Sequence, residues 1–452
     1  MARASAARSA ALALLGDVRR RDARARDVLR SSKRLQDLAT RDRSFAVRLV
    51  MGVVGSVGFL DECVNAHLKR PSRLEPKVRD ALRLGAYELL FLHTPRSVAV
   101  SQGVELARRA SPRAAGLANA VLRRVAEVDV PAREEACERV SQGGGQGDGM
   151  STRDLAMVSG YPEWLVSRVE RTRGSDFVRG LCLSATEAAP LYVAARGAAH
   201  RADDETEGLL RSAGLDPAPG GVEGSYVLRN PAGLASSGLV ERCDVVVADL
   251  SAQRVARSVA SHAASNVLEI GQGRGTKSIL MSDAGRRAGK ELRIVGVDTQ
   301  PFKVGVAERR MEVAGLSTAV SCHVYDACKL DDKDVPSVLE GPFQMVFVDA
   351  PCSGTGTLRR HPEIAWSLDE RSVDSLVALQ GRIVAAASRR VAPGGFLCYA
   401  TCSVLRRENE DVVDAFLISA AGEEFELVEE PFLSAPCLGG ADGHFCAIMS
   451  RG

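Results

Sequence analysis

Two cysteines with similar surroundings could carry out chemistry in this chain of 452 residues. Cys352 follows an apolar run at 345–348, and Asp349 ends that run. Cys402 follows a second apolar run at 396–400, about fifty residues later. Open α/β sheets place functional groups at the carboxyl ends of parallel strands, so we expect the acid and both thiols at one sheet edge. A thiolate beside a carboxyl group is suited to nucleophilic catalysis with proton transfer, whereas the alternative for a lone cysteine is a buried core thiol.

A glycine-rich stretch after an earlier apolar run has the pattern of a ligand-binding loop. Glycines at alternate positions let the backbone turn tightly and approach a ligand closely. A nicotinamide dehydrogenase is disfavoured, because its loop requires glycine where Thr276 stands and because it explains neither cysteine. The candidate cofactor-binding residues in this pattern are Glu269, Gly271, Gly273, Gly275, Asp298, Asp326 and Asp349.

The acids of this set end successive apolar runs. A carboxylate at Asp298 can accept both hydroxyls of a ribose, and one at Asp326 can accept from an adenine amino group. The alternative for any single acid is a helix N-cap or a surface charge. Acids at the ends of successive strands are better explained by a shared ligand at that edge.

A repeated strand–loop–helix rhythm positions these residues. It begins near residue 266 and predicts a doubly wound α/β sheet. Late strands at 425–428 and 445–449 complete the sheet, the last one antiparallel. The remaining strands are expected at 267–270, 293–297, 320–324, 345–348 and 396–400.

The chain is too long for one ordinary core, and its patterning divides it into parts. Residues 1–130 have apolar residues at helical spacings and predict an all-helical domain. Residues 131–150 lose periodicity and end in a glycine cluster, which predicts a flexible linker. Residues 151–240 mix helical and strand patterns and are expected to form a small α+β region, and residues 241–452 are expected to form the α/β domain.

Charge is unevenly distributed along the chain. Residues 1–130 carry 25 Lys and Arg against 13 Asp and Glu, a net +12 that leaves −10 for the rest of a chain of net charge +2. A basic helical segment on a mildly acidic body favours contact with a polyanion such as RNA. The alternative is that these arginines form solvated helix faces.

Cysteine use and hydropathy exclude several classes of protein. The 11 cysteines include no CxxC pair, which argues against a zinc site, so we expect no metal. Scattered thiols without an export signal favour a reducing, cytoplasmic location. The arginine-flanked apolar stretch near the N-terminus favours an amphipathic helix over a signal peptide, and no apolar run is long enough for a membrane span.

Two stretches of the first 130 residues resemble the NusB-like RNA-binding domain, in the form fused to Sun/RsmB-type ribosomal RNA methyltransferases. They are LRLGAYELLFL from Leu82, followed by His93-Thr-Pro, and GLANAVLRR from Gly116. The resemblance implies a helical bundle that contacts RNA. The middle region is similar to the same family, with Ala194-Ala195-Arg196 where Arg-Val-Asn is common.

The two cysteine motifs resemble the signature motifs of RNA cytosine-5 methyltransferases. These motifs are Asp349-Ala-Pro-Cys352 and Thr401-Cys402-Ser403. The resemblance implies a class I S-adenosylmethionine methyltransferase fold with Cys402 as the nucleophile. It also implies that Cys352 assists product release and that Asp349 lies between cytosine and methyl donor. DNA cytosine-5 enzymes use the Pro-Cys thiol instead, so the opposite assignment of the cysteines stays open.

The glycine loop departs from the family pattern. Sun/RsmB-type enzymes carry Cys/Ala-Ala-Pro-Gly-Gly-Lys there, and this chain keeps the lysine as Lys277 but has Arg274 within the loop. The resemblance therefore adds Lys277 to the cofactor-binding residues. The stretch from Gly440 to Phe445 resembles the closing motif of the family, with His444 where an aromatic residue is usual.

The leading hypothesis is a monomeric, cytoplasmic S-adenosylmethionine-dependent enzyme that methylates carbon 5 of a cytosine in RNA, with 16S ribosomal RNA as the favoured substrate. The alternatives are the same chemistry on tRNA and a non-catalytic RNA-binding ribosome-assembly factor.

Overall fold

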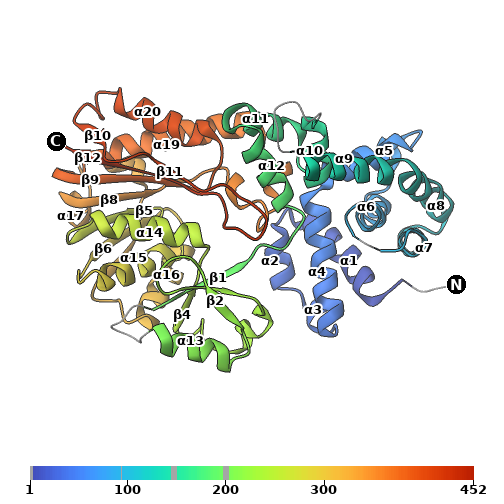
Figure 1. Ribbon diagram of the computed structural model, residues 1–452, viewed down its shortest axis with the longest axis horizontal. Coiled ribbons are helices and arrows are strands. Elements are labelled where there is room, and N and C mark those ends of the chain that lie inside the picture. Colours follow the sequence, from blue (N-terminus) through green and yellow to red (C-terminus); the bar gives the residue numbers. More distant parts are fainter. Residues whose placement is uncertain (1–3, 93, 144–149, 197–202) are drawn as a thin grey trace. The chain divides into compact units, whose positions relative to one another are not determined.

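The computed structural model describes residues 4–92, 94–143, 150–196 and 203–452. The chain divides into two compact units (Figure 1). The first consists of Met1–Ala188 with Leu358–Leu368, and the second of Ala189–Thr357 with Asp369–Gly452.

The described part of the first unit is helical. Its core is a cluster of small and aliphatic side chains such as Leu14, Leu49, Leu84 and Leu122, all fully buried. The α-helices of this unit are α1 (Ala6–Arg21), α2 (Ala25–Arg30), α3 (Lys33–Gln36), α4 (Thr40–Gly55), α5 (Val57–Ala66), α6 (Pro76–Phe91), α7 (Arg96–Ala110), α8 (Ala115–Arg124), α9 (Val130–Gln142), α10 (Thr152–Ser159), α11 (Glu163–Arg173), α12 (Ser175–Ser184) and α18 (Ile364–Ser367). Short turns η1 (Pro71–Arg73) and η2 (Pro112–Ala114) and a π-helical turn η3 (Val125–Asp129) connect some of them.

Helix α9 corrects the expectation of a linker over residues 131–150. Pro131 occupies the first turn of the helix, where it is tolerated, and Ala136 and Val140 are buried. The Arg133 guanidinium donates to the carbonyls of Leu90 and Val158, at 2.8 Å each. Packing and the Arg133 side chain thus stabilise the helix. Its few buried residues are small, so the helical periodicity of the sequence was weak there. The glycine cluster at 144–149 lies outside the described residues.

The expected α+β region at 151–240 is divided between the two units. A capping box between Ser151 and Asp154 starts α10, and helices α10–α12 belong to the helical unit. The strands that follow belong to the second unit. The reason is local, since α10 docks on Arg133 of α9 through the Met157 and Val158 carbonyls. Apart from helix α9 and this division, the domain boundaries expected near residues 130, 150 and 240 stay predictions.

Within the described residues, no single helix is both long and apolar enough to cross a membrane. Helices α4 and α5 pass that test only as a pair, and the chain bends by 77° between them.

The second unit begins with a small antiparallel sheet in the order β2-β3-β1-β4. Arg196, just after β1, is buried and binds Asp283 through an Nε–Oδ2 hydrogen bond of 2.7 Å and the Ala314 carbonyl through Nη2 at 3.0 Å. This arginine therefore anchors the small sheet to the helices of the larger one. The elements are β1 (Leu191–Ala195), α13 (Asp203–Ser212), β2 (Pro217–Pro219), β3 (Ser225–Leu228), η4 (Pro231–Ser236) and β4 (Val245–Val247).

The larger sheet is mixed, with the order β10-β12-β9-β8-β5-β6-β7 and with β11 paired to β12. Strands β5 to β9 are parallel, and the late strands β10, β11 and β12 are antiparallel to their neighbours. The strands are β5 (Asn266–Ile270), β6 (Arg293–Asp298), β7 (Val320–Val324), β8 (Phe343–Asp349), β9 (Val391–Thr401), β10 (Phe425–Leu427), β11 (Phe432–Leu433) and β12 (Phe445–Arg451).

Helices cover both faces of this sheet (Figure 1). Side chains alternate along β8, so that Met345 and Phe347 join one buried cluster while Val346 and Val348 join the other. The first cluster includes residues of α14 (Leu250–His262), α15 (Thr276–Arg287) and α16 (Pro301–Val313). The second includes residues of α17 (Ser337–Glu340), α19 (Glu370–Ser388) and α20 (Glu410–Leu417). The turns η5 (Ala327–Lys329), η6 (Thr355–Thr357) and η7 (Arg406–Glu408) lie in loops between these elements.

The expected fold class is confirmed: a helical N-terminal region, a small sheet in the middle and an α/β domain with a doubly wound sheet. The antiparallel last strand is also confirmed. The two short strands β2 and β11 were not expected, because two or three residues carry no period that can be read from sequence.

Candidate active site

Strands β8 and β9 bring the two cysteines together. They pair in parallel with Asp349 opposite Ala400, and the Ala350 amide donates to the Ala400 carbonyl at 2.9 Å. The loops that leave these strands place the sulfurs of Cys352 and Cys402 at 3.3 Å from each other. Adjacent strands in register thus turn two motifs distant in sequence into one thiol pair.

Lys277 and Asp349 form an ion pair at the same strand ends. The Lys277 Nζ and Asp349 Oδ2 atoms are 2.6 Å apart, with side-chain exposures of 15% and 26%. Burial acts to lower the pKa of Lys277, but the charge of Asp349 and its hydrogen bond outweigh burial and raise that pKa. The lysine therefore stays charged beside the thiol pair.

The two thiols differ in how readily they lose a proton. Their shared hydrogen bond lowers the pKa of Cys402, with help from Lys277 and against burial and Asp349. The same hydrogen bond, followed by burial, raises the pKa of Cys352. The arrangement thus favours a thiolate at Cys402 and a thiol at Cys352.

The glycine loop follows β5 and closes against β8. Gly271 has a φ of +80°, and a Cβ atom there would lie 2.2 Å from the Asp349 carbonyl oxygen. Only glycine fits this close approach. The Gly273 amide donates to Asp298 Oδ2 at 3.1 Å, and Gly275 is the N-cap of α15, which carries Lys277.

The acids at the ends of β5, β6 and β7 have different surroundings. Glu269 is fully buried and accepts from the Ser278 hydroxyl at 2.5 Å. Asp298 accepts from the Gly273 and Gln300 amides, and the exposed Asp326 caps the turn η5 through the Cys328 amide at 3.0 Å. For Asp326, the N-cap alternative raised from sequence is therefore present in the structure.

Burial has a strong effect on Glu269. It raises the pKa of this carboxyl to about 8, and the Ser278 hydrogen bond opposes it only in part. The Oε1 atoms of Glu269 and of nearby Gln272 are buried and have no partner among the described residues. Buried acceptors without partners are rare in folded proteins.

Strand β12 adds a residue that the sequence showed only as a departure from the family pattern. Because Phe445 pairs with Thr401, His444 comes next to the loop of Cys402. His444 is 6% exposed, and its Nδ1 atom has no hydrogen-bond partner within the described part of the chain. Burial, followed by the charge of Lys277, lowers the pKa of His444 to about 4, so the ring is neutral at pH 7.

Glu408 is the functional candidate that sequence reasoning missed. It is fully buried on η7, and both of its carboxylate oxygens accept hydrogen bonds from the loops of the two cysteines. In sequence it stands in Arg406-Arg407-Glu408, a stretch that is typical of a charged surface. No signal in that pattern points to burial.

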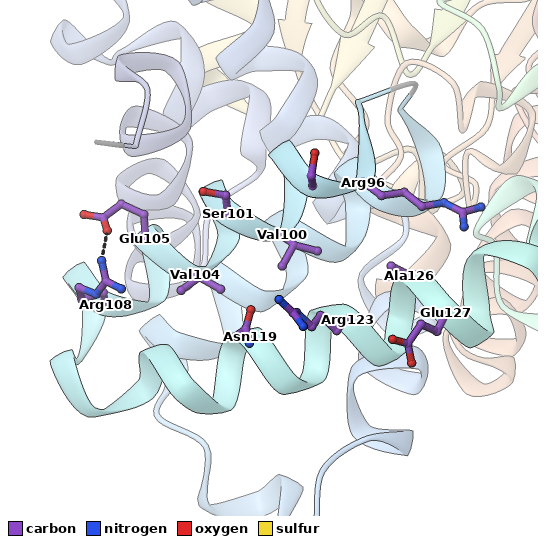
Figure 2. A pocket seen from close by; sticks show the side chains of 11 residues that line it. Arg96, Val100, Ser101, Val104, Glu105, Arg108, Asn119, Arg123, Ala126 and Glu127 are labelled. Atoms are coloured by element: carbon purple, nitrogen blue, oxygen red, sulfur yellow. Dashed lines mark hydrogen bonds and ion pairs between the residues drawn. The ribbon is translucent and has the colours of Figure 1, made fainter. Parts of the chain in front are cut away.

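A second candidate surface lies in the helical unit. It is a groove of about 620 Å³ between α7 and the segment from α8 to η3. Figure 2 shows Arg123 and Asn119 pointing from α8 toward Val100 and Val104 of α7. Arg123 is exposed and has no hydrogen-bond or ion-pair partner among the described residues, whereas neighbouring Arg124 pairs with Glu127 at 3.2 Å.

Across the ranges that the structure describes, no group of three or more His, Cys, Asp or Glu side chains could hold a metal ion.

The sheet order, the glycine loop and the thiol pair define an S-adenosylmethionine-dependent methyltransferase. Residues 258–438 match the family described as 16S rRNA methyltransferase RsmB/F, and residues 5–127 match the NusB family. The chain is 31% identical to ribosomal RNA small subunit methyltransferase B of Thermus thermophilus, over 99% of this chain and 98% of that protein. It is 29% identical to the protein of the same name from Salmonella typhi, over 84% of this chain and 83% of that one.

The chain therefore belongs to the RsmB/F family of 16S rRNA methyltransferases. Among solved structures, that of PH0851 covers 98% of this chain with a TM-score of 0.76 at 19% identity. A methyltransferase homologue from Pyrococcus horikoshii covers 67% with a TM-score of 0.53 at 17% identity. These likenesses at low identity concern the fold alone.

The family membership confirms the expected enzyme class and the expected N-terminal region. The chain is an S-adenosylmethionine-dependent RNA (cytosine-C5) methyltransferase with an N-terminal NusB region.

Proposed function

We propose that this enzyme transfers a methyl group from S-adenosylmethionine to carbon 5 of one cytosine in 16S ribosomal RNA, through an adduct between Cys402 Sγ and carbon 6. The observation that carries the proposal is the 3.3 Å separation of the Cys352 and Cys402 sulfurs, at the strand ends where Asp349 lies. The relatives named ribosomal RNA small subunit methyltransferase B support the choice of RNA.

The proposed roles follow from the chemistry of cytosine. Carbon 5 is a poor nucleophile until a thiolate adds to carbon 6, and the lowered pKa of Cys402 supports this residue as the one that adds. Asp349 holds the N3 edge of the base while charge shifts onto the ring. Carbon 5 then bonds to the methyl carbon as the methyl–sulfonium bond breaks, and S-adenosylhomocysteine leaves. A base removes the carbon-5 proton, the C5–C6 double bond re-forms, and Cys402 leaves carbon 6 as a thiolate with assistance from Cys352.

The residues proposed to hold the cofactor fit such a ligand. The bound cofactor supplies an electrophilic methyl group. The glycine loop leaves its backbone open at Gly273, where a Cβ atom would meet nothing nearer than the Gly271 carbonyl oxygen at 3.8 Å. Asp298 keeps acceptor capacity for ribose hydroxyls beyond its two amide bonds. The full proposed set is Glu269, Gly271, Gly273, Gly275, Lys277, Asp298, Asp326 and Asp349.

The groove of α7 and α8 is proposed as one RNA-contacting surface of the basic helical unit. Arg123 has no described partner and faces the groove, so its charge is available for a phosphate. The Arg123→Glu variant should weaken RNA binding and reduce the slope of log affinity against log salt by about one. Filter binding over a salt series measures both, and Arg124→Glu, at the neighbouring paired residue, is the matched control. Equal effects of the two variants would contradict a specific role of the groove.

We further propose a monomer that acts in the cytoplasm on a target base that is single-stranded or flipped out of its stack, because a stacked base cannot reach the strand ends.

A methyl-transfer assay tests the proposal. Deproteinised 16S RNA from cells without the enzyme is incubated with labelled S-adenosylmethionine and with wild type, Cys402→Ala or Cys352→Ala. We expect label in 5-methylcytosine with wild type, none with Cys402→Ala, and a trapped protein–RNA adduct with Cys352→Ala. An adduct with Cys402→Ala instead would reverse the roles, and transfer to tRNA alone would replace the proposed substrate.

A further inference from the structure

Glu408 is a buried acid whose partners all belong to the catalytic loops or to the helix behind them. Its Oε1 accepts from the Ser353 amide at 2.7 Å and from Gln380 Nε2 at 3.1 Å. Its Oε2 accepts from the hydroxyls of Ser353 at 2.5 Å and of Ser403 at 2.6 Å. No Lys or Arg pairs with it in the described ranges. A buried carboxylate without a cation is destabilising unless donors surround it, and here four donors do so.

The identity of these partners gives Glu408 a specific place. Ser353 directly follows Cys352, and Ser403 directly follows Cys402. Gln380 also donates to the carbonyl of Pro351, the residue before Cys352, at 2.9 Å. One carboxylate therefore links the loop after β8 to the loop after β9 at the residues that adjoin the two sulfurs.

The backbone of Glu408 is itself held from β9. The Tyr399 hydroxyl donates to the Glu408 carbonyl at 2.6 Å, and the Asn409 side chain donates to the Ser403 carbonyl at 2.9 Å. Thr401 donates to Asn409 Oδ1 at 2.6 Å. The carboxylate thus extends from a fixed point and has little freedom to follow the loops if they move.

We propose that Glu408 is a positioning residue that sets the separation of the Cys352 and Cys402 sulfurs by holding Ser353 and Ser403 at the same time. Only the catalytic consequence rests on the proposed function; the separation itself does not.

The separation matters because both sulfurs must reach one cytosine ring. Misplacement of a reacting group by about 1 Å can lower a rate by about 10²-fold. Each cysteine lies on a loop beyond its strand, and the Gly356 amide joins the two loops by donating to the Cys402 carbonyl at 2.9 Å. Glu408 adds a shared anchor one residue past each sulfur.

Glu408→Gln tests the proposal, since it keeps the shape and replaces one accepting oxygen with an NH₂ donor. Toward the Ser353 amide and Gln380, that donor loses one pair of hydrogen bonds. Toward the two serine hydroxyls, it keeps the contacts only with reversed direction and without the carboxylate charge, so they are weaker. We expect kcat to fall by about 10²-fold while the KM for S-adenosylmethionine stays within about twofold. The thermal unfolding midpoint is recorded alongside.

A second measurement needs neither RNA nor cofactor. Dibromobimane bridges two thiols only when they lie close together, and peptide mass mapping identifies the Cys352–Cys402 product. We expect slower bridging in Glu408→Gln than in wild type. Ser353→Ala with Ser403→Ala should give the same loss, and adding Glu408→Gln to that pair should change little, because the three side chains act as a unit.

Asp411→Asn is the matched control, because it makes the same acid-to-amide change a few residues on, at an exposed pair with Arg406. It should leave bridging and kcat at wild-type values. A Glu408→Gln variant that unfolds at lower temperature but keeps wild-type bridging and kcat would overturn the proposal and leave Glu408 a fold-stabilising residue. If Cys402→Ala proves active, the proposed function fails, but the bridging result still decides the role of Glu408.

Discussion

The ends of β8 and β9 and the ends of β5, β6 and β7 belong to one sheet, yet their side chains behave differently. At β8 and β9 the functional side chains contact one another or a charged partner, as in the 3.3 Å sulfur pair and in the 2.6 Å ion pair of Asp349 with Lys277 of α15. At β5 to β7 each acid is bound mainly by uncharged donors: Glu269 by the Ser278 hydroxyl, Asp298 by the Gly273 and Gln300 amides, and Asp326 by the amide in the turn that it caps.

The difference teaches that equivalent positions in a sheet do not imply equivalent roles. Groups that touch one another, as at β8 and β9, can share protons and a reacting atom. Acids that are bound mainly by hydroxyl and amide donors, as at β5 to β7, can contribute contacts to a ligand but do not belong to the thiol pair. The first edge should therefore respond to mutation through catalysis, and the second through cofactor affinity and stability.

The largest expected effect is at the first edge. Asp349→Asn keeps the shape of the side chain but removes the charge that pairs with Lys277 and the group proposed to hold the cytosine N3 edge. We expect kcat to fall by about 10² to 10⁴-fold, measured by single turnover at saturating cofactor. The same change at Asp326 should leave kcat near wild type. Comparable losses of kcat in both variants would remove the distinction between the edges.

Glu269→Gln tests the second edge, at β5 to β7, through the free energy of unfolding. The folded chain keeps the Glu269 proton up to a pKa of about 8, whereas the unfolded chain loses it near the ordinary value of 4.5. Wild-type stability from this group is therefore complete below about pH 4.5 and is lost as the pH rises to about 8, at roughly 1.4 kcal/mol per pH unit. Glutamine has no proton to lose, so the variant should gain about 3 to 5 kcal/mol over wild type between those limits.

Urea unfolding at several pH values measures this gain. The exposed Glu340 provides a control, and Glu340→Gln should differ from wild type by the same small amount at every pH. A difference between Glu269→Gln and wild type that does not grow with pH would show that the buried acid is ionised in the folded chain.

The smallest expected effect separates two acids of the second edge. Asp298 accepts from the amide of Gly273 and so supports the glycine loop, whereas Asp326 caps its own turn. Asp298→Asn should weaken S-adenosylmethionine binding by about tenfold, because a charge-assisted hydrogen bond and a ribose acceptor are lost together. Asp326→Asn should weaken it by less, about threefold. Isothermal titration calorimetry gives both values, and the reverse order would contradict the assignment of the ribose contact to Asp298.

The sequence was informative wherever the backbone decides position. An apolar run that ends in an acid and a cysteine predicts a strand end, and two such runs in one parallel sheet predict proximity, as the pairing of Asp349 with Ala400 confirms. Gly271 was likewise readable, because its close approach to Asp349 requires a residue without Cβ. The helical and sheet regions followed from periodicity in the same way.

The sequence did not predict the direction in which individual side chains point. Glu408 follows two arginines in a stretch that is typical of a surface, and only the tertiary structure turns it toward Ser353 and Ser403. Helix α9 was missed because Ala136 and Val140 are small and few, and because part of its support comes from the Arg133 side chain. Glu269 and Asp326 fit the same pattern in sequence but differ in burial, which no pattern of residues specified.

The thiol pair has an evolutionary consequence. Cys352 and Cys402 follow neighbouring parallel strands, and a cytosine that contacts one sulfur needs only a small shift to contact the other, 3.3 Å away. Substitutions could therefore move the nucleophilic role from one cysteine to the other without forming a new pocket. They would have to lower the pKa of Cys352 and raise that of Cys402.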